Sequence, residues 1–186
     1  MWMKCDTFCA IMQPFVDQHL DKLLGLSNPT IWTSFRAVPD LLLLTEVQDF
    51  DDPPDHSVLM ITTDSHGEKY FFDGTIDQYG WDWRTNWLMT EKELMESHID
   101  LSQVPCFQDD DFEDVKATRA VAMGMDNEYG YWAIASRRME QIFRQIDWDA
   151  LRGCAEGEIE ERIRLLSRAS FAGAFEETMA QQDTSL

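Results

Sequence analysis

The amino-acid sequence predicts an α+β fold, in which a small antiparallel sheet packs against an N-terminal helix and C-terminal helices. Three observations lead to this prediction. Apolar residues recur with the 3.6-residue period of a helix between Cys5 and Leu24. Two strand-like segments flank a tight turn between His56 and Asp73. Charged segments with helical periodicity then occupy most of the chain after Tyr131.

The first helix is predicted over Cys5 to Leu24, and Gly25 is a suitable residue to end it. Pro14 lies inside this range. Because proline lacks an amide hydrogen and its ring clashes with the preceding turn, Pro14 either kinks the helix or begins a second one.

Asp6 or Thr7 is the expected N-cap, which places Cys5 at the start of the helix. The helix dipole and the free N–H groups at such a position favour a thiolate over a thiol. Cys9 lies one turn later on the apolar face, so packing is its expected role.

The central segment is predicted to be a β-hairpin. Its strands run from His56 to Thr63 and from Glu68 to Asp73, and the residues Asp64 to Gly67 form the turn. Pro and Gly are absent from both strands, and β-branched and aromatic residues are common in them.

The hairpin register brings a histidine and an aspartate together. Pairing Thr63 with Glu68 places Asp73 opposite Val58. His56 precedes Val58 by two residues, so His56 and Asp73 share one face on a diagonal. Such diagonal Cβ atoms lie roughly 7–8 Å apart, which allows an imidazole to reach a carboxylate.

Three further elements are predicted in the first half of the chain. Thr30 to Val38 alternates and is rich in strand-forming residues, so it is expected to be a strand. Asp40 to Val47 is consistent with a buried strand or a short helix. Thr90 and Glu93 form a capping box that predicts a helix from Glu91 to His98.

The second half is predicted to be mainly helical. Val115 to Met123 is consistent with a helix or a strand, and Tyr131 to Ile146 with a helix. Trp148 to Cys154 is expected to be a turn region. A charged amphipathic helix is expected from Glu158 to Met179, with Gly173 as its weak point.

Length and composition are those of a folded domain. The chain has 186 residues, 44% of them hydrophobic, with seven Trp and eleven Phe, so we expect a single domain over residues 1–186. Its catalytic-like core is expected over about residues 1–90 and a helical part over about residues 90–180. No apolar run approaches the roughly 20 residues of a membrane helix, and the N-terminal residues lack the apolar core of a signal peptide.

The four cysteines show neither zinc-site nor disulfide-scaffold spacing, so we expect a reducing, cytoplasmic setting. We expect no cofactor, because no glycine-rich phosphate-binding loop is present. The acidic run Asp109 to Asp111 is of a kind that binds calcium, but its spacing is not that of an EF-hand, and no metal site is assigned.

The formal net charge of −20 limits the classes of partner. It argues against nucleic acid, whose backbone requires a basic surface, and against anionic membranes. The expected partner is therefore a small-molecule or peptide substrate, and the oligomeric state is left open.

A carboxylate beside a histidine fixes its tautomer and stabilises its protonated form, which is half of a nucleophilic triad. Cys5, at the start of its helix, is the candidate nucleophile. Taken singly, His56 is equally consistent with a surface histidine, Asp73 with a turn-forming residue, and Cys5 with an inert cysteine.

The sequence places a cysteine at the start of a helix, a histidine on a later strand, and Asp73-Gly74-Thr75 at the end of the next strand. This pattern resembles that of the transglutaminase-like and papain-like cysteine enzymes. The resemblance covers roughly Cys5 to Trp81. It implies that Cys5 is the nucleophile, His56 the general base and Asp73 the residue that orients it. It also implies a papain-like or transglutaminase-like core and thiol-dependent acyl transfer or hydrolysis of an amide, ester or thioester.

Substrate-binding candidates follow the second hairpin strand. Trp81 and Trp83 are placed to wall a substrate cleft, or equally to pack the joint between the sheet and the helices. Gln78 is placed to donate a hydrogen bond into the site, or to end a strand. Two other functions stay open: an inactive binding module of the same fold, and a cyclase or isomerase that uses His56 and Asp73 for acid–base chemistry.

Overall fold

The computed structural model describes residues 4–24, 28–38, 55–64, 66–102, 107–109, 116–117, 120, 130–151 and 153–174. The chain forms two compact units, Met1–Thr118 and Arg119–Leu186. The boundary between them lies later in the chain than about residue 90, where we expected the sheet-bearing core to end. The mixed α+β class predicted from the sequence is confirmed.

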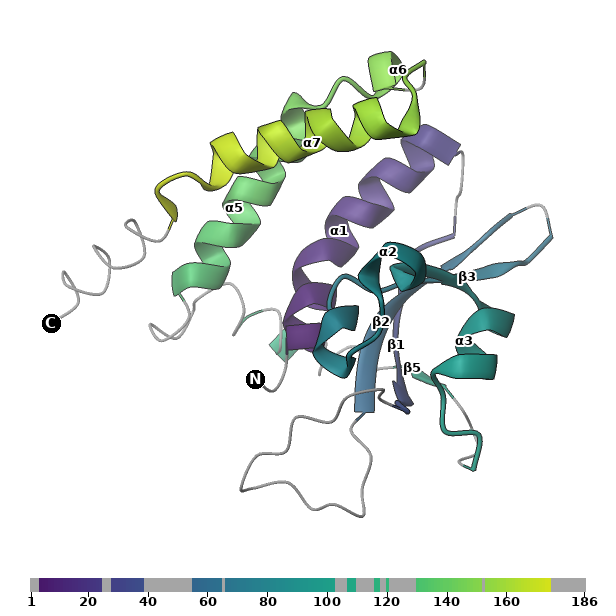
Figure 1. The fold of residues 1–186 in the computed structure, drawn as a ribbon. Coiled ribbons are helices and arrows are strands. Elements are labelled where there is room, and N and C mark those ends of the chain that lie inside the picture. The colour runs from purple at the N-terminus through teal and green to yellow at the C-terminus, as the bar shows by residue number, and fades with distance from the viewer. Residues whose placement is uncertain are drawn as a thin grey trace, which may run out of the picture. The chain divides into compact units, whose positions relative to one another are not determined.

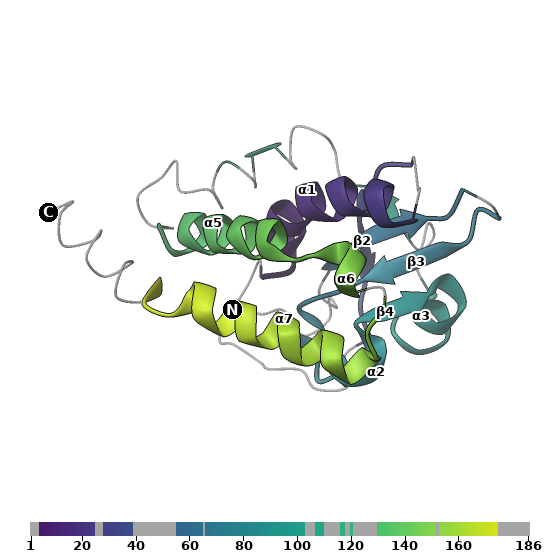
Figure 2. The same ribbon diagram turned by 90° about the horizontal axis from the view of Figure 1, so that it is seen from above.

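The first unit is built on an antiparallel sheet with the strand order β4-β3-β2-β1-β5. Figure 1 labels β1, β2, β3 and β5, and Figure 2 labels β4. The strands are β1 (Ile31–Arg36), β2 (Asp55–Thr62), β3 (Lys69–Phe72), β4 (Leu88–Thr90) and the two-residue β5 (Gln108–Asp109). The predicted strand over Thr30 to Val38 is confirmed as β1, whereas β4 was not anticipated.

The β2–β3 hairpin has the predicted register. Thr62 lies opposite Lys69, and Leu59 lies opposite Phe72. In the turn, the Thr63 amide donates to the Glu68 carbonyl at 2.9 Å. The turn closes through Gly67, whose φ of 66° is one that glycine adopts without steric cost.

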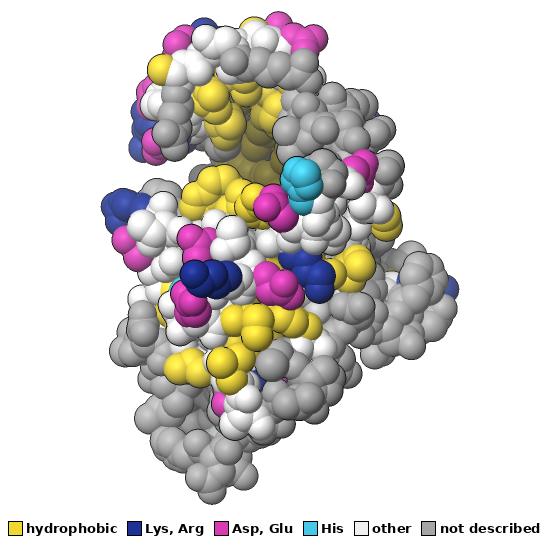
Figure 3. Space-filling view, turned by 90° about the vertical axis from the view of Figure 1, so that its right-hand side faces the viewer, with side chains coloured by type: hydrophobic (Ala, Val, Ile, Leu, Met, Phe, Trp, Pro, Cys, Tyr) yellow, Lys and Arg dark blue, Asp and Glu magenta, His cyan; other side chains and the backbone are white. Residues whose placement is uncertain are grey.

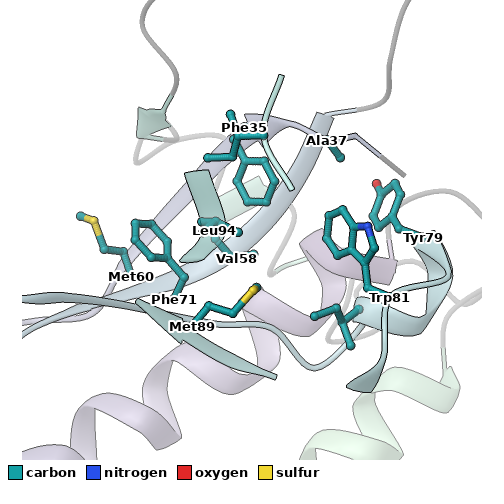
Figure 4. Packing of buried hydrophobic residues seen from close by; sticks show 11 residues of the cluster. Phe35, Ala37, Val58, Met60, Phe71, Tyr79, Trp81, Met89 and Leu94 are labelled. Carbon is teal, nitrogen blue, oxygen red and sulfur yellow. The ribbon is translucent and has the colours of Figure 1, made fainter. Parts of the chain in front are cut away.

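The two faces of the sheet carry different partners. Helix α1 (Lys4–Leu24) lies on one face (Figures 1 and 2), where the rings of Phe8 and Phe72 meet edge to face, 5.4 Å apart. The other face carries the main hydrophobic cluster of the unit, to which α3 (Glu91–Ser97) contributes Leu94. Figure 4 shows this cluster: Phe35, Ala37, Val58, Met60, Phe71, Ile76, Tyr79, Trp81, Met89, Leu94 and Ile99.

The structure corrects one expectation about α1 and excludes one of two alternatives for Pro14. The helix begins at Lys4, so Asp6 and Thr7 lie within its first turn and neither is the N-cap. Pro14 does not start a second helix, because α1 continues through it to Leu24.

Contacts on both sides of Pro14 attach α1 to the segment that leads into β1. Gln13 Nε2 donates to the Thr30 carbonyl at 2.7 Å, and the Thr30 amide donates to Asp17 Oδ1 at 2.6 Å. These bonds help to retain a helix that has lost one backbone hydrogen bond at proline.

The capping box is confirmed. The Thr90 hydroxyl accepts from the Glu93 amide at 3.3 Å, and the Glu93 carboxylate accepts from the Thr90 amide at 2.9 Å. Two short elements that the sequence did not predict connect β3 to β4: the 3₁₀ helix η1 (Ile76–Tyr79) and α2 (Trp83–Asn86).

Basic side chains of the first unit lie beside acidic ones. Lys69 Nζ is 3.5 Å from Glu91 Oε1, and Lys92 Nζ is 3.7 Å from Glu96 Oε1. Figure 3 shows acidic, basic and hydrophobic groups interspersed on the face of the molecule that it presents.

The second unit consists of α5 (Gly130–Gln145), α6 (Trp148–Leu151) and α7 (Glu156–Phe171). The predicted helix from Tyr131 is confirmed as α5, and α6 adds one helical turn in the expected turn region. The last helix, α7, ends at Phe171, and Gly173, its expected weak point, follows with a φ of 77°. Ala174 is helical again, and the rest of the predicted range to Met179 lies outside the described residues. The buried residues of this unit include Ile142, Ile146 and Leu151, packed against side chains of α7.

Two sequence predictions concern residues beyond those described. Asp40 to Val47 lies entirely outside them, and most of Val115 to Met123 does. Within the described part of the chain, the helices are too short or too polar to cross a membrane.

Candidate active site

His56 and Asp73 meet on the face of the sheet opposite α1. His56 is the second residue of β2, and Asp73 follows the last residue of β3. His56 Nε2 lies 2.5 Å from Asp73 Oδ2, and both side chains are 0% exposed. His56 and Asp73 share one face of the sheet, as predicted, and they form a direct hydrogen bond in a site without water access.

The second oxygen of Asp73 is held by the residue two positions later. Asp73 Oδ1 accepts from the Thr75 amide at 2.8 Å and from the Thr75 hydroxyl at 3.1 Å. The Asp73 backbone amide donates to the Trp87 carbonyl at 3.0 Å, which anchors the end of β3 beside β4. The Asp73-Gly74-Thr75 sequence thus orients the carboxylate as well as ending the strand.

Gly74 is required where the hairpin end passes α1. A Cβ added at Gly74 would lie 2.2 Å from Cε2 of Phe8, far inside van der Waals contact. The Phe8 ring packs against Phe72, which limits its freedom to move away.

Gly74→Ala is therefore expected to lower the free energy of unfolding by about 1–3 kcal/mol, the usual cost of overpacking. The clash would displace the first turn of α1, which also carries Cys5. Urea unfolding of the variant measures the loss, and Gly157→Ala, where an added Cβ meets no atom within 4 Å, is the matched control. Equal stability of Gly74→Ala and the wild type would contradict the expected close contact.

Cys5 reaches the same histidine from α1. It is the second residue of the helix, is 6% exposed and is a free thiol. The interaction with Cys5 raises the pKa of His56. The thiol also donates a hydrogen bond to Asp6 Oδ1 at 3.8 Å.

The charge state of His56 follows from competing effects. Complete burial by itself lowers its pKa, but the charge and hydrogen bond of Asp73, followed by those of Cys5, outweigh burial and raise the pKa to about 9. His56 is therefore protonated at neutral pH in this environment. A cationic imidazolium is a favourable neighbour for a thiolate, because the two opposite charges form an ion pair.

Three aromatic rings surround the His56 imidazole at steep angles. The ring centroids of Phe35, Tyr79 and Trp81 lie 5.5, 4.5 and 5.6 Å from that of His56. Burial, followed by the charges of Cys5 and Asp73, raises the pKa of Tyr79 well above its usual range, so Tyr79 is neutral. These rings exclude water and restrict rotation of the imidazole.

Sequence reasoning did not connect Phe35 or Tyr79 with the site. The available signal for Phe35 was the pairing of β1 with β2, because Phe35 lies directly opposite His56 in that register. Tyr79 lies on η1, and its position depends on contacts between residues distant in sequence.

The substrate-binding candidates fall in different surroundings. Trp81 is 3% exposed, contacts His56, and donates from Nε1 to the Val38 carbonyl at 3.2 Å, so it is a packed part of the site. Gln78 lies in η1 and Trp83 begins α2, but their side chains are outside the described atoms.

A second polar contact joins α1 to β2 beside the thiol. The Ser57 hydroxyl donates to Asp6 Oδ1 at 2.5 Å, and the Cys5 Sγ lies 3.8 Å from the same oxygen. Asp6 was expected only as one of two possible N-caps, and Ser57 was not expected to take part in the site. Neither residue belongs to a recognisable motif, and their contact depends on the docking of α1.

No group of three or more His, Cys, Asp or Glu side chains suited to a metal occurs among the described residues, a set that excludes Asp110 and Asp111. Comparison of the chain with protein-family models, with curated proteins and with solved structures gave no match. The interpretation of the site therefore depends on its own geometry.

Proposed function

We propose that this protein is a cysteine-dependent acyltransferase or hydrolase of the transglutaminase-like or papain-like type, acting on an amide, ester or thioester of a small molecule or peptide. One observation carries the proposal. The buried His56 interacts with Asp73 through one side of its ring and with Cys5, in the first turn of a helix, as its other partner. Covalent catalysis by a thiol requires a nucleophile, a base that takes its proton, and a group that orients the base. Cys5, His56 and Asp73 are arranged in this order.

The reaction begins with the thiol proton on His56 and the thiolate on Cys5. The thiolate attacks the substrate carbonyl, and the resulting oxyanion is stabilised by backbone N–H groups of the first turn of α1, which lack acceptors within the helix. His56 then gives its proton to the leaving amine, alcohol or thiol. A thioester on Cys5 remains.

Water or an amine next attacks the thioester carbonyl, and His56 accepts the proton of the incoming nucleophile. The bond between the carbonyl carbon and Cys5 Sγ then breaks, which releases the acid or amide product and restores the thiolate beside the protonated His56. Asp73 holds the imidazole in one orientation and stabilises its positive charge through both steps. A reducing, cytoplasmic setting suits this chemistry, because it would keep the Cys5 thiol reduced.

Alkylation of Cys5 by iodoacetamide, followed against pH and resolved by site with mass spectrometry, tests the proposal. We expect Cys5 of the wild type to react at about pH 6, at least about tenfold faster than a free thiol with a pKa near 8.5 would allow. Cys154, which is only partly buried and forms part of the same molecule, is the internal reference thiol. In His56→Gln, the expected advantage of Cys5 over Cys154 disappears.

A Cys5 that follows the pH profile of Cys154 in both proteins would overturn the proposal in favour of an inactive binding module. Survival of a measured activity in Cys5→Ser, with its loss in His56→Gln, would instead indicate acid–base chemistry by His56 and Asp73. Incubation with an activated acyl ester tests for the acyl-enzyme directly. The result that supports the proposal is a mass increase of one acyl group on Cys5.

A further inference from the structure

Two pairs of consecutive residues join the start of α1 to the start of β2. Cys5 interacts with His56, and the next residue of each element forms the Asp6–Ser57 hydrogen bond. Side chains alternate along a strand, so Ser57 points to the face that α1 covers while His56 points to the other. Ser57 is 5% exposed, whereas Asp6 is half-buried, so their short bond is partly buried.

We propose that Asp6 and Ser57 are a positioning pair, which holds the Cys5 thiol against the imidazole and sets the balance between thiol and thiolate. This inference depends on the proposed function, since it assigns the two residues a part in the same thiol chemistry.

The Asp6–Ser57 bond holds the first turn of α1, which carries Cys5. The described bonds of Gln13 and Asp17 attach the helix to Thr30, but these residues lie two to three turns after Cys5. The Asp6–Ser57 bond acts one residue from the nucleophile on α1 and one residue from His56 on β2. Because a misplacement of about 1 Å costs up to about a hundredfold in rate, a bond at this place controls reactivity strongly.

A single carboxylate oxygen of Asp6 contacts both Ser57 and Cys5. Asp6 Oδ1 accepts from Ser57 at 2.5 Å and lies 3.8 Å from the Cys5 sulfur. A protonated thiol can donate weakly to this oxygen, whereas a thiolate is repelled by it. The Ser57 hydroxyl binds the charged oxygen and so reduces that repulsion. Asp6 therefore opposes thiolate formation, and Ser57 assists it.

Two substitutions separate these effects and are expected to act in opposite directions. Ser57→Ala removes both the attachment and the donor, so Cys5 alkylation should slow by about tenfold or more at about pH 7. Asp6→Asn retains a carbonyl oxygen for Ser57 but removes the charge, so alkylation at about pH 6 should accelerate by about threefold to tenfold. Ser57→Thr, which keeps the hydroxyl, should restore most of the rate lost in Ser57→Ala.

The controls are matched by residue type. Ser136→Ala removes another buried serine hydroxyl, and Asp17→Asn removes another α1 carboxylate, far along the helix from Cys5. Both should leave Cys5 alkylation within about twofold of wild type. Cys9, which is fully buried, reports folding in every sample, because it should stay unalkylated while α1 is packed.

The outcomes distinguish this inference from the function on which it depends. If wild-type Cys5 reacts like Cys154 and His56→Gln changes nothing, the proposed function fails and the inference falls with it. If wild-type reactivity depends on His56, but Ser57→Ala and Asp6→Asn leave it unchanged or shift it in the same direction, the inference alone is wrong. Opposite shifts in variants that keep Cys9 protected establish the positioning pair.

Discussion

Replacement of Asp73 by alanine is expected to lower the free energy of unfolding by about 3–5 kcal/mol, the usual cost of breaking a buried ion pair by removing one partner. His56 would lose the 2.5 Å bond to Asp73 in a site with 0% exposure, and Thr75 would lose the acceptor for its amide and hydroxyl. Since a domain is stable by about 5–15 kcal/mol, this single change removes a large share of the total.

Asp73→Asn separates stability from reactivity. The amide keeps the shape and can still accept from Thr75 through its oxygen, so the stability loss should be smaller than in Asp73→Ala. It cannot stabilise an imidazolium, however, so His56-dependent alkylation of Cys5 should fall by about a hundredfold or more. Urea unfolding and site-resolved alkylation on the same samples measure both quantities.

Asp82 provides the matched control for these variants. Its Oδ1 accepts from the amide two residues later, Arg84, at 3.0 Å, as Asp73 accepts from Thr75, but its side chain is 54% exposed. Asp82→Ala should cost only about 1 kcal/mol, typical of a lost N-cap, and should not change Cys5 reactivity. Equal losses at the two positions would contradict the buried ion pair.

The free energy of unfolding is expected to decline by about 3 kcal/mol as the pH rises from about 6.5 to about 9. Burial lowers the pKa of His56, but Asp73 and Cys5 raise it further, to about 9 in the folded protein, against 6.5 as its ordinary value. The folded state therefore binds the proton more tightly than the unfolded state. The resulting stabilisation is complete below about pH 6.5 and is lost as the pH passes through about 9.

Urea unfolding at about pH 6, 7.5 and 9.5 measures this decline. The comparison is best made in a Cys5→Ser background, because the thiol then no longer titrates. This background also removes the part of the His56 pKa rise that Cys5 contributes. His56→Gln should flatten the curve, and Asp73→Ala should flatten it nearly as much, because Asp73 is the larger of the two stabilising partners. A wild-type curve parallel to that of His56→Gln would show that His56 is not protonated in the folded protein.

Local patterns were sufficient to predict much of the sheet. Strand-forming residues on both sides of a four-residue turn predicted the Thr63–Glu68 pairing, and that register placed His56 and Asp73 on one face. The capping box at Thr90 was equally local. Helix ends were less certain: Asp6 or Thr7 was expected as the N-cap although α1 begins at Lys4, and α7 ends at Phe171, shortly before the expected weak point Gly173.

The sequence by itself therefore determined which side chains of the hairpin share a face, because alternation along a strand and a short turn are properties of neighbouring residues. Only the tertiary structure decided that the start of α1 docks beside the start of β2. This docking brings Cys5 to His56 and Asp6 to Ser57 across about 50 residues of chain. The physical reason is that helix docking results from burial of apolar side chains such as Phe8 against Phe72, a non-local balance that no short sequence pattern specifies.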